Sequence, residues 1–370
     1  MEKRLDYRWI ARFDNPWNIA GEMKTNTTCS HDKPSVPGEN EAAGYHFINL
    51  AFTCLRFGPG LILLLLVLTL GLSSPYFFTA RNLGNVLAQT ATIAVLAMGQ
   101  HLVILTRGID LSVGSVLALS SVAGALVYRE VHSAVFVVAT MIGTGLAVGF
   151  INGFVYVWGR LPHPFIITLA TLSIAKGLAL ELAGGAAIPG MPDSILFLGG
   201  GSISGVPASA FVAGGVAVVL AYGSRSVVWG RWIYAVGGNP DAATQVGIPI
   251  KGVLLSVYMI SGAVAGIGAV LTSGRTAAGS PLFGNLAELD SIAAVIIGGA
   301  SFLGGRGHIG NALIGALMIG VIRNALNLLN VDIFFQLIAI GVIIVLAVEG
   351  DVLRARLEER FRVIQSMTVK

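Results

Sequence analysis

Charged and amide side chains set in otherwise apolar sequence are the residues of this chain that could act on a solute. Lys176, Asp290, Arg323 and Asn327 each lie within or at the edge of a long apolar run. Ionisable side chains in such runs are costly, and they commonly mark a solute pathway or a partner group. Amide and guanidinium groups also donate hydrogen bonds that hydroxyl groups accept. These four residues are therefore candidates to line a path for a polar solute.

The spacing of three of these polar residues predicts a shared helix face. Arg323, Asn327 and Asn330 follow one another at i, i+4 and i+7. They could line a path, or they could bond neighbouring helices together at about 0.6 kcal/mol for each hydrogen bond. Lys176 could likewise face the path or extend toward the outer interface. Asp290 is expected to cap the helix that starts near residue 288, with a role as a gate as the alternative.

A second candidate segment, residues 106–115, contains turn, capping and small residues. Gly108 is expected to turn the chain, and Asp110 or Ser112 to cap the following helix. Gly114 and Ser115 permit close helix packing. A helix-turn-helix with a satisfied cap is favoured, and contact of Asp110 and Ser112 with a solute is the alternative.

A third segment, residues 231–248, predicts a short helix between two longer ones. Residues 237–239 form a turn, Asn239 can cap a helix, and Pro240 suits its first position. Asp241 is favourable at a helix N-terminus, and Gly247 is expected to end the helix. An ordinary connecting loop is the alternative interpretation.

Motifs for catalysis are absent from the sequence. It contains no Gly-x-Ser-x-Gly or His-Glu-x-x-His motif, and its six histidines are scattered. No Gly-Lys dipeptide occurs, which excludes a Walker A phosphate loop. Two cysteines, Cys29 and Cys54, make neither a disulfide framework nor a metal site. We therefore expect no enzyme activity and no cofactor or metal on this chain; if ATP drives its function, another chain binds it.

The composition indicates the kind of protein that positions these residues. Hydrophobic residues make up 55% of the 370 and charged residues only 11%, where a soluble chain carries about 25%. Only 20 of the 42 charged residues lie between Gly58 and Gly350. This shortage of charged residues argues against a cytosolic enzyme. The net charge of +4 is small and half of it lies in the two ends, which argues against a nucleic-acid partner. The 48 glycines suit closely packed helices in lipid.

Apolar runs of about 20 residues predict an all-α polytopic membrane protein with about ten transmembrane helices. The expected spans are 58–76, 87–106, 112–128, 133–158, 164–183, 207–224, 252–274, 288–303, 309–328 and 332–349. The segments starting at 288 and 309 flank a tight Gly304-Gly305-Arg306-Gly307 turn and could be re-entrant instead. We expect a polar, partly disordered tail over 1–56, a membrane domain over 57–350 and a second tail over 351–370.

The distribution of cations predicts the orientation. With ten spans and the N-terminus inside, 18 Lys and Arg residues fall on the cytoplasmic side and three outside. The three outside are Arg81, Arg129 and Arg275. Both termini are therefore expected in the cytoplasm.

Four ordered stretches resemble the ribose-type sugar permeases of bacterial ATP-binding cassette importers, in the branched-chain amino acid/ribose permease superfamily. They are GIDLSVGS (108–115), YAVGGN (234–239) with 242–243 and 247–248, ELDSIAAVIIGG (288–299) with 304–307, and GAL (315–317) with NALNLL (324–329). The resemblance extends from about Asn82 to Glu349.

This resemblance implies a multi-pass permease subunit in the bacterial cytoplasmic (inner) membrane. It implies inward transport of a monosaccharide such as ribose, xylose or galactose, or of a polyol such as inositol. The implied partners are an ATP-binding cassette subunit, a periplasmic solute-binding protein and a second permease subunit. The third segment would be the coupling helix that docks on the ATPase, through Gly237, Gly238, Asn239, Asp241, Ala242, Ala243 and Gly247.

An ion-coupled secondary transporter of a small polar solute is the alternative function. Such transporters usually carry ionisable residues deep in the membrane for ion coupling. Lys176 and Arg323 are the only deep charges expected here, with no deep carboxylate unless Glu181 lies further inside. The sequence therefore favours the ATP-driven class.

Overall fold

The computed structural model of the chain describes residues 59–368, with side chains described as far as residue 350 and at residue 352. The tail expected over 1–56 lies outside the described residues. In the described part, helices predominate and the strands are only two residues long.

Each of the ten predicted spans overlaps a helix. They are Pro59–Ser73, α2 (Ala80–Leu105), α3 (Val113–Val131), α4 (Ala134–Trp158), α5 (Phe165–Leu182), α7 (Ala208–Ser226), α10 (Ile250–Thr276), α11 (Ala287–Ile297), α12 (Ile309–Leu328) and α13 (Ile333–Thr368). Among the described residues, seven helices are long and apolar enough to cross a membrane: α2, α4, α5, α7, α10, α12 and residues 333–350 of α13. An all-α polytopic membrane fold is therefore confirmed, and the count of ten spans stays a prediction.

Helix α11 is shorter than expected, with 11 residues. The span predicted over 288–303 ends as a helix at Ile297, where Gly298 and Gly299 follow, the latter with φ +92°. Eleven residues rise about 16 Å, roughly half of a hydrocarbon core. The chain then continues as an irregular loop over 298–308, which fits the re-entrant alternative better than a complete span.

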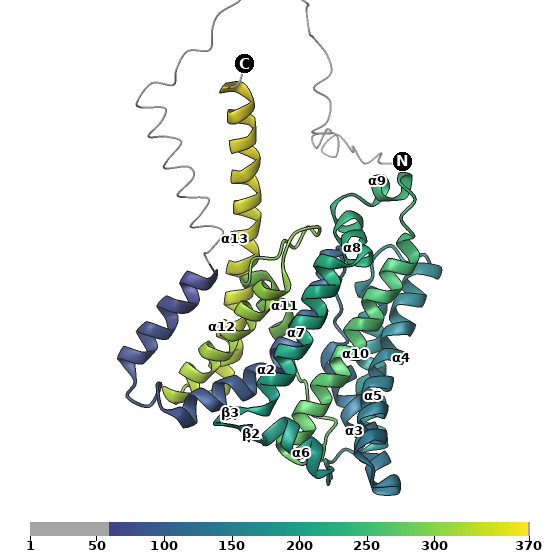
Figure 1. Cartoon of the computed structure of the whole chain (residues 1–370), viewed down its shortest axis with the longest axis vertical. Coiled ribbons are helices and arrows are strands. Elements are labelled where there is room, and N and C mark those ends of the chain that lie inside the picture. Colours follow the sequence, from purple (N-terminus) through teal and green to yellow (C-terminus); the bar gives the residue numbers. More distant parts are fainter. Residues whose placement is uncertain (1–58, 369–370) are drawn as a thin grey trace, which may run out of the picture. The chain divides into compact units, whose positions relative to one another are not determined.

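Short elements connect the long helices. They are β1 (Ile188–Pro189), α6 (Asp193–Gly200), β2 (Ser202–Ile203), β3 (Val206–Pro207), α8 (Val228–Gly238), α9 (Pro240–Gln245) and β4 (Ala278–Gly279). β1 pairs with β4 and β2 with β3, both antiparallel. Helices α8 and α9 lie at one end of the bundle, and α6, β2 and β3 lie at the other (Figure 1).

Helix α2 is a central element of the bundle. Most of its residues from Ala91 to Leu105 are buried, and it packs against α7, α10, α11 and α12. Helices α4 and α10 pack face to face through glycines, and a Cβ added at Gly145 would overlap the carbonyl oxygen of Gly262. Small residues at such a contact let two helix backbones approach closely, as in membrane-embedded bundles.

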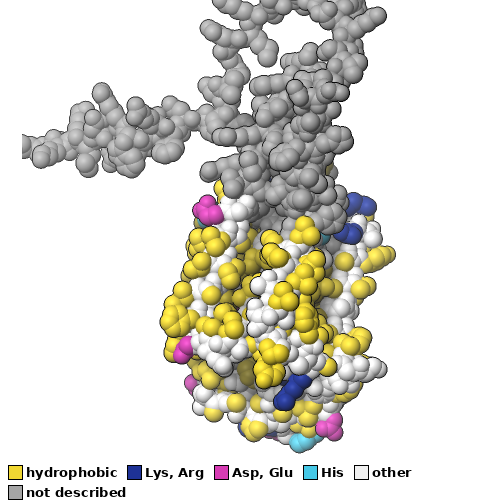
Figure 2. Space-filling model, turned by 90° about the vertical axis from the view of Figure 1, so that its left-hand side faces the viewer, with side chains coloured by type: hydrophobic (Ala, Val, Ile, Leu, Met, Phe, Trp, Pro, Cys, Tyr) yellow, Lys and Arg dark blue, Asp and Glu magenta, His cyan; other side chains and the backbone are white. Residues whose placement is uncertain are grey.

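Apolar side chains cover the outside of the bundle. Val135 on α4, Val218 on α7 and Phe334 on α13 are each at least 70% exposed. In Figure 2, hydrophobic side chains are spread over the described surface, with few charged ones among them. A surface of this kind suits contact with lipid. Helix α13 continues without a break to Thr368, so the segment expected as a separate tail from residue 351 is helical.

Candidate functional site

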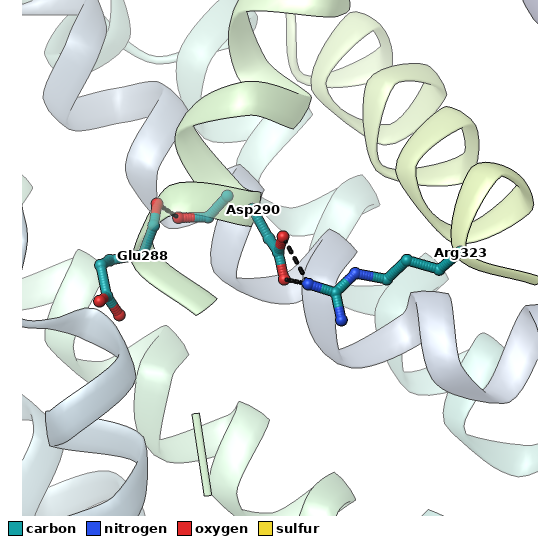
Figure 3. A network of polar contacts seen from close by, with 4 residues as sticks. Glu288, Asp290 and Arg323 are labelled. Carbon is teal, nitrogen blue, oxygen red and sulfur yellow. Dashed lines mark hydrogen bonds and ion pairs between the residues drawn. The ribbon is translucent and has the colours of Figure 1, made fainter. Parts of the chain in front are cut away.

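Two of the predicted path residues form an ion pair. Arg323 on α12 donates from Nη2 to both carboxylate oxygens of Asp290 on α11, at 2.8 and 2.6 Å (Figure 3). The Asp290 side chain is 6% exposed and that of Arg323 31%. The N-cap of α11 is Leu286, so the expectation that Asp290 caps this helix is wrong. Its carboxylate instead faces α12, where the cation that offsets its burial is located.

A cavity of about 230 Å³ opens beside this ion pair. Its walls come from α2, α3, α10, α11, α12 and the loop before α11, through Gln89, Thr92, Ile93, Leu96, Leu117, Thr272, Arg275, Gly284, Asn285, Ala287, Asp290, Gly320 and Arg323. Drug-sized ligands usually occupy more than about 300 Å³, so this space suits a smaller molecule. The two amides, two hydroxyls and two guanidinium groups of the lining can hydrogen-bond a solute rich in hydroxyl groups.

Several polar groups in this cavity have hydrogen-bond donors that the described residues do not fully use. Thr92 on α2 and Thr272 on α10 hold their hydroxyl oxygens 3.5 Å apart. The side chain of Arg275 on α10 makes no hydrogen bond or ion pair with any described residue, and the buried Nε of Arg323 has no partner there either. Four polar lining residues were not predicted from the sequence: Gln89, Thr92, Thr272 and Asn285. The spacing of Gln89 and Thr92 at i, i+3 on one apolar helix is the signal that could have found the first two.

The predicted polar stripe on α12 is wrong at its last residue. The helix ends at Leu328, and Asn330 lies in the following turn with φ +54°. Asn327 does not line the cavity: its Oδ1 accepts a hydrogen bond of 2.9 Å from Nε2 of Gln336 on α13. This contact favours the helix-bonding alternative for Asn327.

Lys176 on α5 is also not among the residues that line the cavity. Its Nζ donates to the carbonyl oxygen of Pro281 at 2.7 Å. The bond holds α5 against the loop that precedes α11. Lys176 therefore supports the segment that carries Gly284 and Asn285 into the cavity wall.

Asp110 and Ser112 are the centre of a buried polar network. Asp110 Oδ1 accepts from the backbone N–H of Ser112 at 3.0 Å and from its hydroxyl at 2.6 Å. Ser261 on α10 donates to Oδ2 at 3.0 Å. Both Asp110 and Ser112 are 1% exposed. Ser112 occupies the N-cap position of α3, as expected, but its side chain makes no capping hydrogen bond to the helix.

This network extends to two further helices. Asn152 on α4 donates to the Ser112 hydroxyl at 2.9 Å and accepts from Thr171 on α5 at 2.6 Å. Asn82 on α2 and Asn324 on α12 form a separate buried pair, exchanging hydrogen bonds of 3.0 and 2.7 Å. Buried polar groups need such partners, since an unpaired one costs about 1–3 kcal/mol. The arrangement gives Asp110 and Ser112 a structural role.

Helix α9 matches the local structure predicted for its segment. Oδ1 of Asn239 accepts from the backbone N–H of Ala242 at 3.0 Å, and Pro240 is the first helical residue. Gly247 follows the helix with φ +79°, a conformation that favours glycine.

The side chains of α9 differ from the expectation in one respect. Ala243 is 3% exposed and packs in the chain's own core, so it does not lie on an outward face. The exposed residues are Asp241, Ala242, Thr244, Gln245 and Val246, and Val246 is 75% exposed.

A loop junction lies where α8 meets α9. We define it by residues 105–108, 237–239 and 304–307. Arg107 donates from Nε to the carbonyl oxygen of Gly237 and from Nη2 to that of Gly238, both at 2.6 Å. The backbone N–H of Gly305 donates to the carbonyl oxygen of Leu105 at 2.9 Å. Arg107 has φ +63°, which costs a non-glycine residue about 1–2 kcal/mol and is maintained here by these contacts.

These features define a class of protein. A polytopic helical bundle with a polar cavity near one end and a capped, outward-facing short helix at the other has the organisation of a membrane transport subunit. The chain belongs to the family described as branched-chain amino acid transport system permease components, whose family model matches residues 82–348. The stretch identified by resemblance, from about Asn82 to Glu349, is therefore confirmed.

Sugar permeases are among the relatives of the chain. It is 38% identical to the D-allose transport system permease protein AlsC of Escherichia coli, over 85% of this chain and 96% of the relative. It is 40% identical to the ribose import permease protein RbsC of Bacillus subtilis, over 80% and 92%. It is 32% identical to the L-arabinose ABC transporter permease protein AraH of Azospirillum brasilense, over 88% and 94%. No solved structure matches the chain.

Proposed function

We propose that this chain is the permease subunit of an ATP-binding cassette importer that moves a monosaccharide, or a related polyol, into the cell. The observation that carries the proposal is the capped helix α9, which presents Val246 outward in a chain that belongs to a permease family. Relatives named for allose, ribose and arabinose support a monosaccharide as the solute. ATP is bound by a separate subunit, and this chain needs no cofactor of its own.

Helix α9 is the proposed docking element for that subunit. Asn239 and Gly247 fix its two ends, and Ala243 anchors it to the core. This leaves the exposed residues Asp241, Ala242, Thr244, Gln245 and Val246 to contact a partner. Small outward residues beside one exposed apolar side chain suit insertion into a cleft of another protein.

The orientation follows from the same end of the bundle. Arg107, Gly238 and Gly305 meet in the loop junction, and the sequence places all three segments on the cytoplasmic side. We therefore propose that α9 and both termini face the cytoplasm of a bacterium. A periplasmic solute-binding protein delivers the sugar at the opposite end, and a second permease subunit completes the path in the inner membrane.

The cavity beside Asp290 and Arg323 is the proposed part of the path in this chain. It lies toward the end opposite α9, because Arg275 borders it and the backbone of Arg275 packs on Gly199 of α6. The ion pair and the amides around it can exchange hydrogen bonds with sugar hydroxyls. Asp110, Ser112, Lys176 and Asn327 support the walls instead, through the contacts described above.

Reconstitution tests the proposal against an ion-coupled secondary transporter. Proteoliposomes with this chain, an ATP-binding subunit and a solute-binding protein should take up D-ribose, D-allose or L-arabinose only with ATP. Uptake by the chain alone, driven by an ion gradient, would establish the alternative.

A substitution on α9 tests the docking element. Val246→Asp should weaken copurification with the ATP-binding subunit by about tenfold or more, because burying a valine contributes about 1.5–3 kcal/mol. Leu282→Asp is the matched control, since Leu282 is 66% exposed and precedes α11. Equal copurification of both variants and the wild type would exclude α9 as the docking helix.

A further inference from the structure

Arg107 connects the proposed docking helix to the cavity walls. Its guanidinium holds two carbonyl oxygens, those of Gly237 and Gly238, at the C-terminus of α8 immediately before α9 begins. Hydrogen bonds from a charged donor are stronger than neutral ones, and a cation is favoured at a helix C-terminus. Because Arg107 directly follows α2 and its C-cap, the α8–α9 corner is bonded to the end of α2.

The backbones in the loop junction are in direct contact. A Cβ added at Gly237 would overlap the carbonyl oxygen of Leu105 and lie 2.7 Å from the backbone N of Gly305. The Tyr234 hydroxyl on α8 donates to the carbonyl oxygen of Gly307 at 2.8 Å. With no side chain between these backbones to absorb a displacement, a movement of the α8–α9 corner passes to α2 and to the α11–α12 loop.

The same elements form the cavity at the other end. Gln89, Thr92, Ile93 and Leu96 of α2 line it, and Gln89 lies about 24 Å along the helix from Leu105. Helix α10 follows α9 in the chain and supplies Thr272 to the opposite wall, where its hydroxyl meets that of Thr92. Covalent connection therefore links α9 to the α10 wall, whereas Arg107 links it to the α2 wall.

We infer that Arg107 is a positioning residue for coupling: it makes the α2 and α10 walls move together when the ATP-binding subunit moves α9. This inference rests on the proposed function. Without the guanidinium, movement of α9 reaches α10 through the chain but is no longer transmitted fully to α2. ATP hydrolysis then proceeds without an equivalent opening and closing of the cavity.

Substitution of Arg107 separates hydrolysis from uptake. Arg107→Met removes both donors at similar length, and Arg107→Lys keeps the charge with a single donor centre. Arg231→Met on α8 is the control, since Arg231 is exposed and no hydrogen bond or ion pair joins its side chain to the described residues. Copurification of the wild type with the ATP-binding subunit is measured first, so that a failure of the proposed function is recognised separately.

The expected result is a change in the ratio of sugar moved to ATP hydrolysed. Arg107→Met should bind the ATP-binding subunit and hydrolyse ATP, but lower the ratio of D-ribose, D-allose or L-arabinose moved per ATP by about tenfold. Arg107→Lys should give an intermediate ratio and Arg231→Met the wild-type ratio. An unchanged ratio in Arg107→Met, with hydrolysis and uptake both normal or both reduced by the same factor, would overturn the inference.

A cross-link tests whether the connection between residues 107 and 238 itself sets the sugar-to-ATP ratio, independently of any effect of the substitutions on folding. The double variant Arg107→Cys/Gly238→Cys is made with Cys29 and Cys54 replaced by Ser; a Cβ at Gly238 meets no atom within 4 Å. A short bis-methanethiosulfonate cross-linker forms a disulfide with each cysteine and releases methanesulfinate. It should raise the sugar-to-ATP ratio of this variant toward the wild-type value, and cleavage by a reductant should lower the ratio again. A cross-link that forms and leaves the ratio low would overturn the inference.

Discussion

The Asp290–Arg323 pair gives a prediction that separates a charge effect from a packing effect. Arg323→Met removes the cation at similar length and leaves the Asp290 carboxylate, 6% exposed, without its partner. The loss of one partner of a fully buried pair costs about 3–5 kcal/mol. Arg323 is 31% exposed beside an open cavity, so water compensates in part, and we expect about 1–3 kcal/mol.

The double variant Asp290→Asn/Arg323→Met should recover most of this loss, because the amide carries no charge that needs a cation. Thermal unfolding of the four purified proteins in one detergent, at one scan rate, measures the order of stabilities, and the coupling between the two sites should exceed about 1 kcal/mol. Uptake should fall in all three variants if the pair also lines the path. The electrostatic reasoning is refuted if Arg323→Met is as stable as the wild type, or if the double variant loses the sum of the two single losses.

Three further predictions follow from other contacts. Gly145→Leu should destabilise the bundle by about 1–3 kcal/mol or more, because the added side chain meets the α10 backbone. The control Gly143→Leu should unfold at the wild-type temperature, because no atom lies within 4 Å of a Cβ added at Gly143. Asn327→Leu should lower stability by about 0.6 kcal/mol through loss of the Gln336 bond and leave uptake unchanged; a large loss of uptake would return Asn327 to the path. With Cys29 and Cys54 removed, Ile203→Cys should react with an impermeant thiol reagent added outside intact cells and Gln245→Cys should not, and the reverse pattern would invert the topology.

The helices of this protein could be predicted well because apolar run length is a strong signal. All ten predicted spans contain helices, and α12 has the predicted bounds of Ile309–Leu328. The α11 span was predicted too long, because the apolar residues continue past Ile297 to Leu303 although Gly298 and Gly299 turn the chain. Hydropathy does not distinguish a helix from an irregular loop that is equally apolar.

The site could be predicted only in part, because one sequence shows which residues are polar but not which residues they face. Asp290 and Arg323 were identified separately, and their pairing depends on how α11 and α12 are turned toward each other. Ala243 was assigned to an outward face although it is buried, since six residues of helix carry too little pattern to show which side is covered. The role of Arg107 depends on contacts with residues 130 positions away in the chain. Local sequence patterns do not predict such long-range contacts.

The loop after α11 has a consequence for engineering of the protein. Loops between helices usually tolerate inserted tags, since their backbones are solvated and lengthening them costs little. In this loop, Gly305 donates to Leu105 and the carbonyl oxygen of Gly307 accepts from Tyr234, so its backbone is matched to other segments. An epitope inserted between Gly304 and Gly307 would break both contacts, whereas the β2–β3 hairpin, whose tip at Ser204 and Gly205 is exposed, offers a site that leaves them intact.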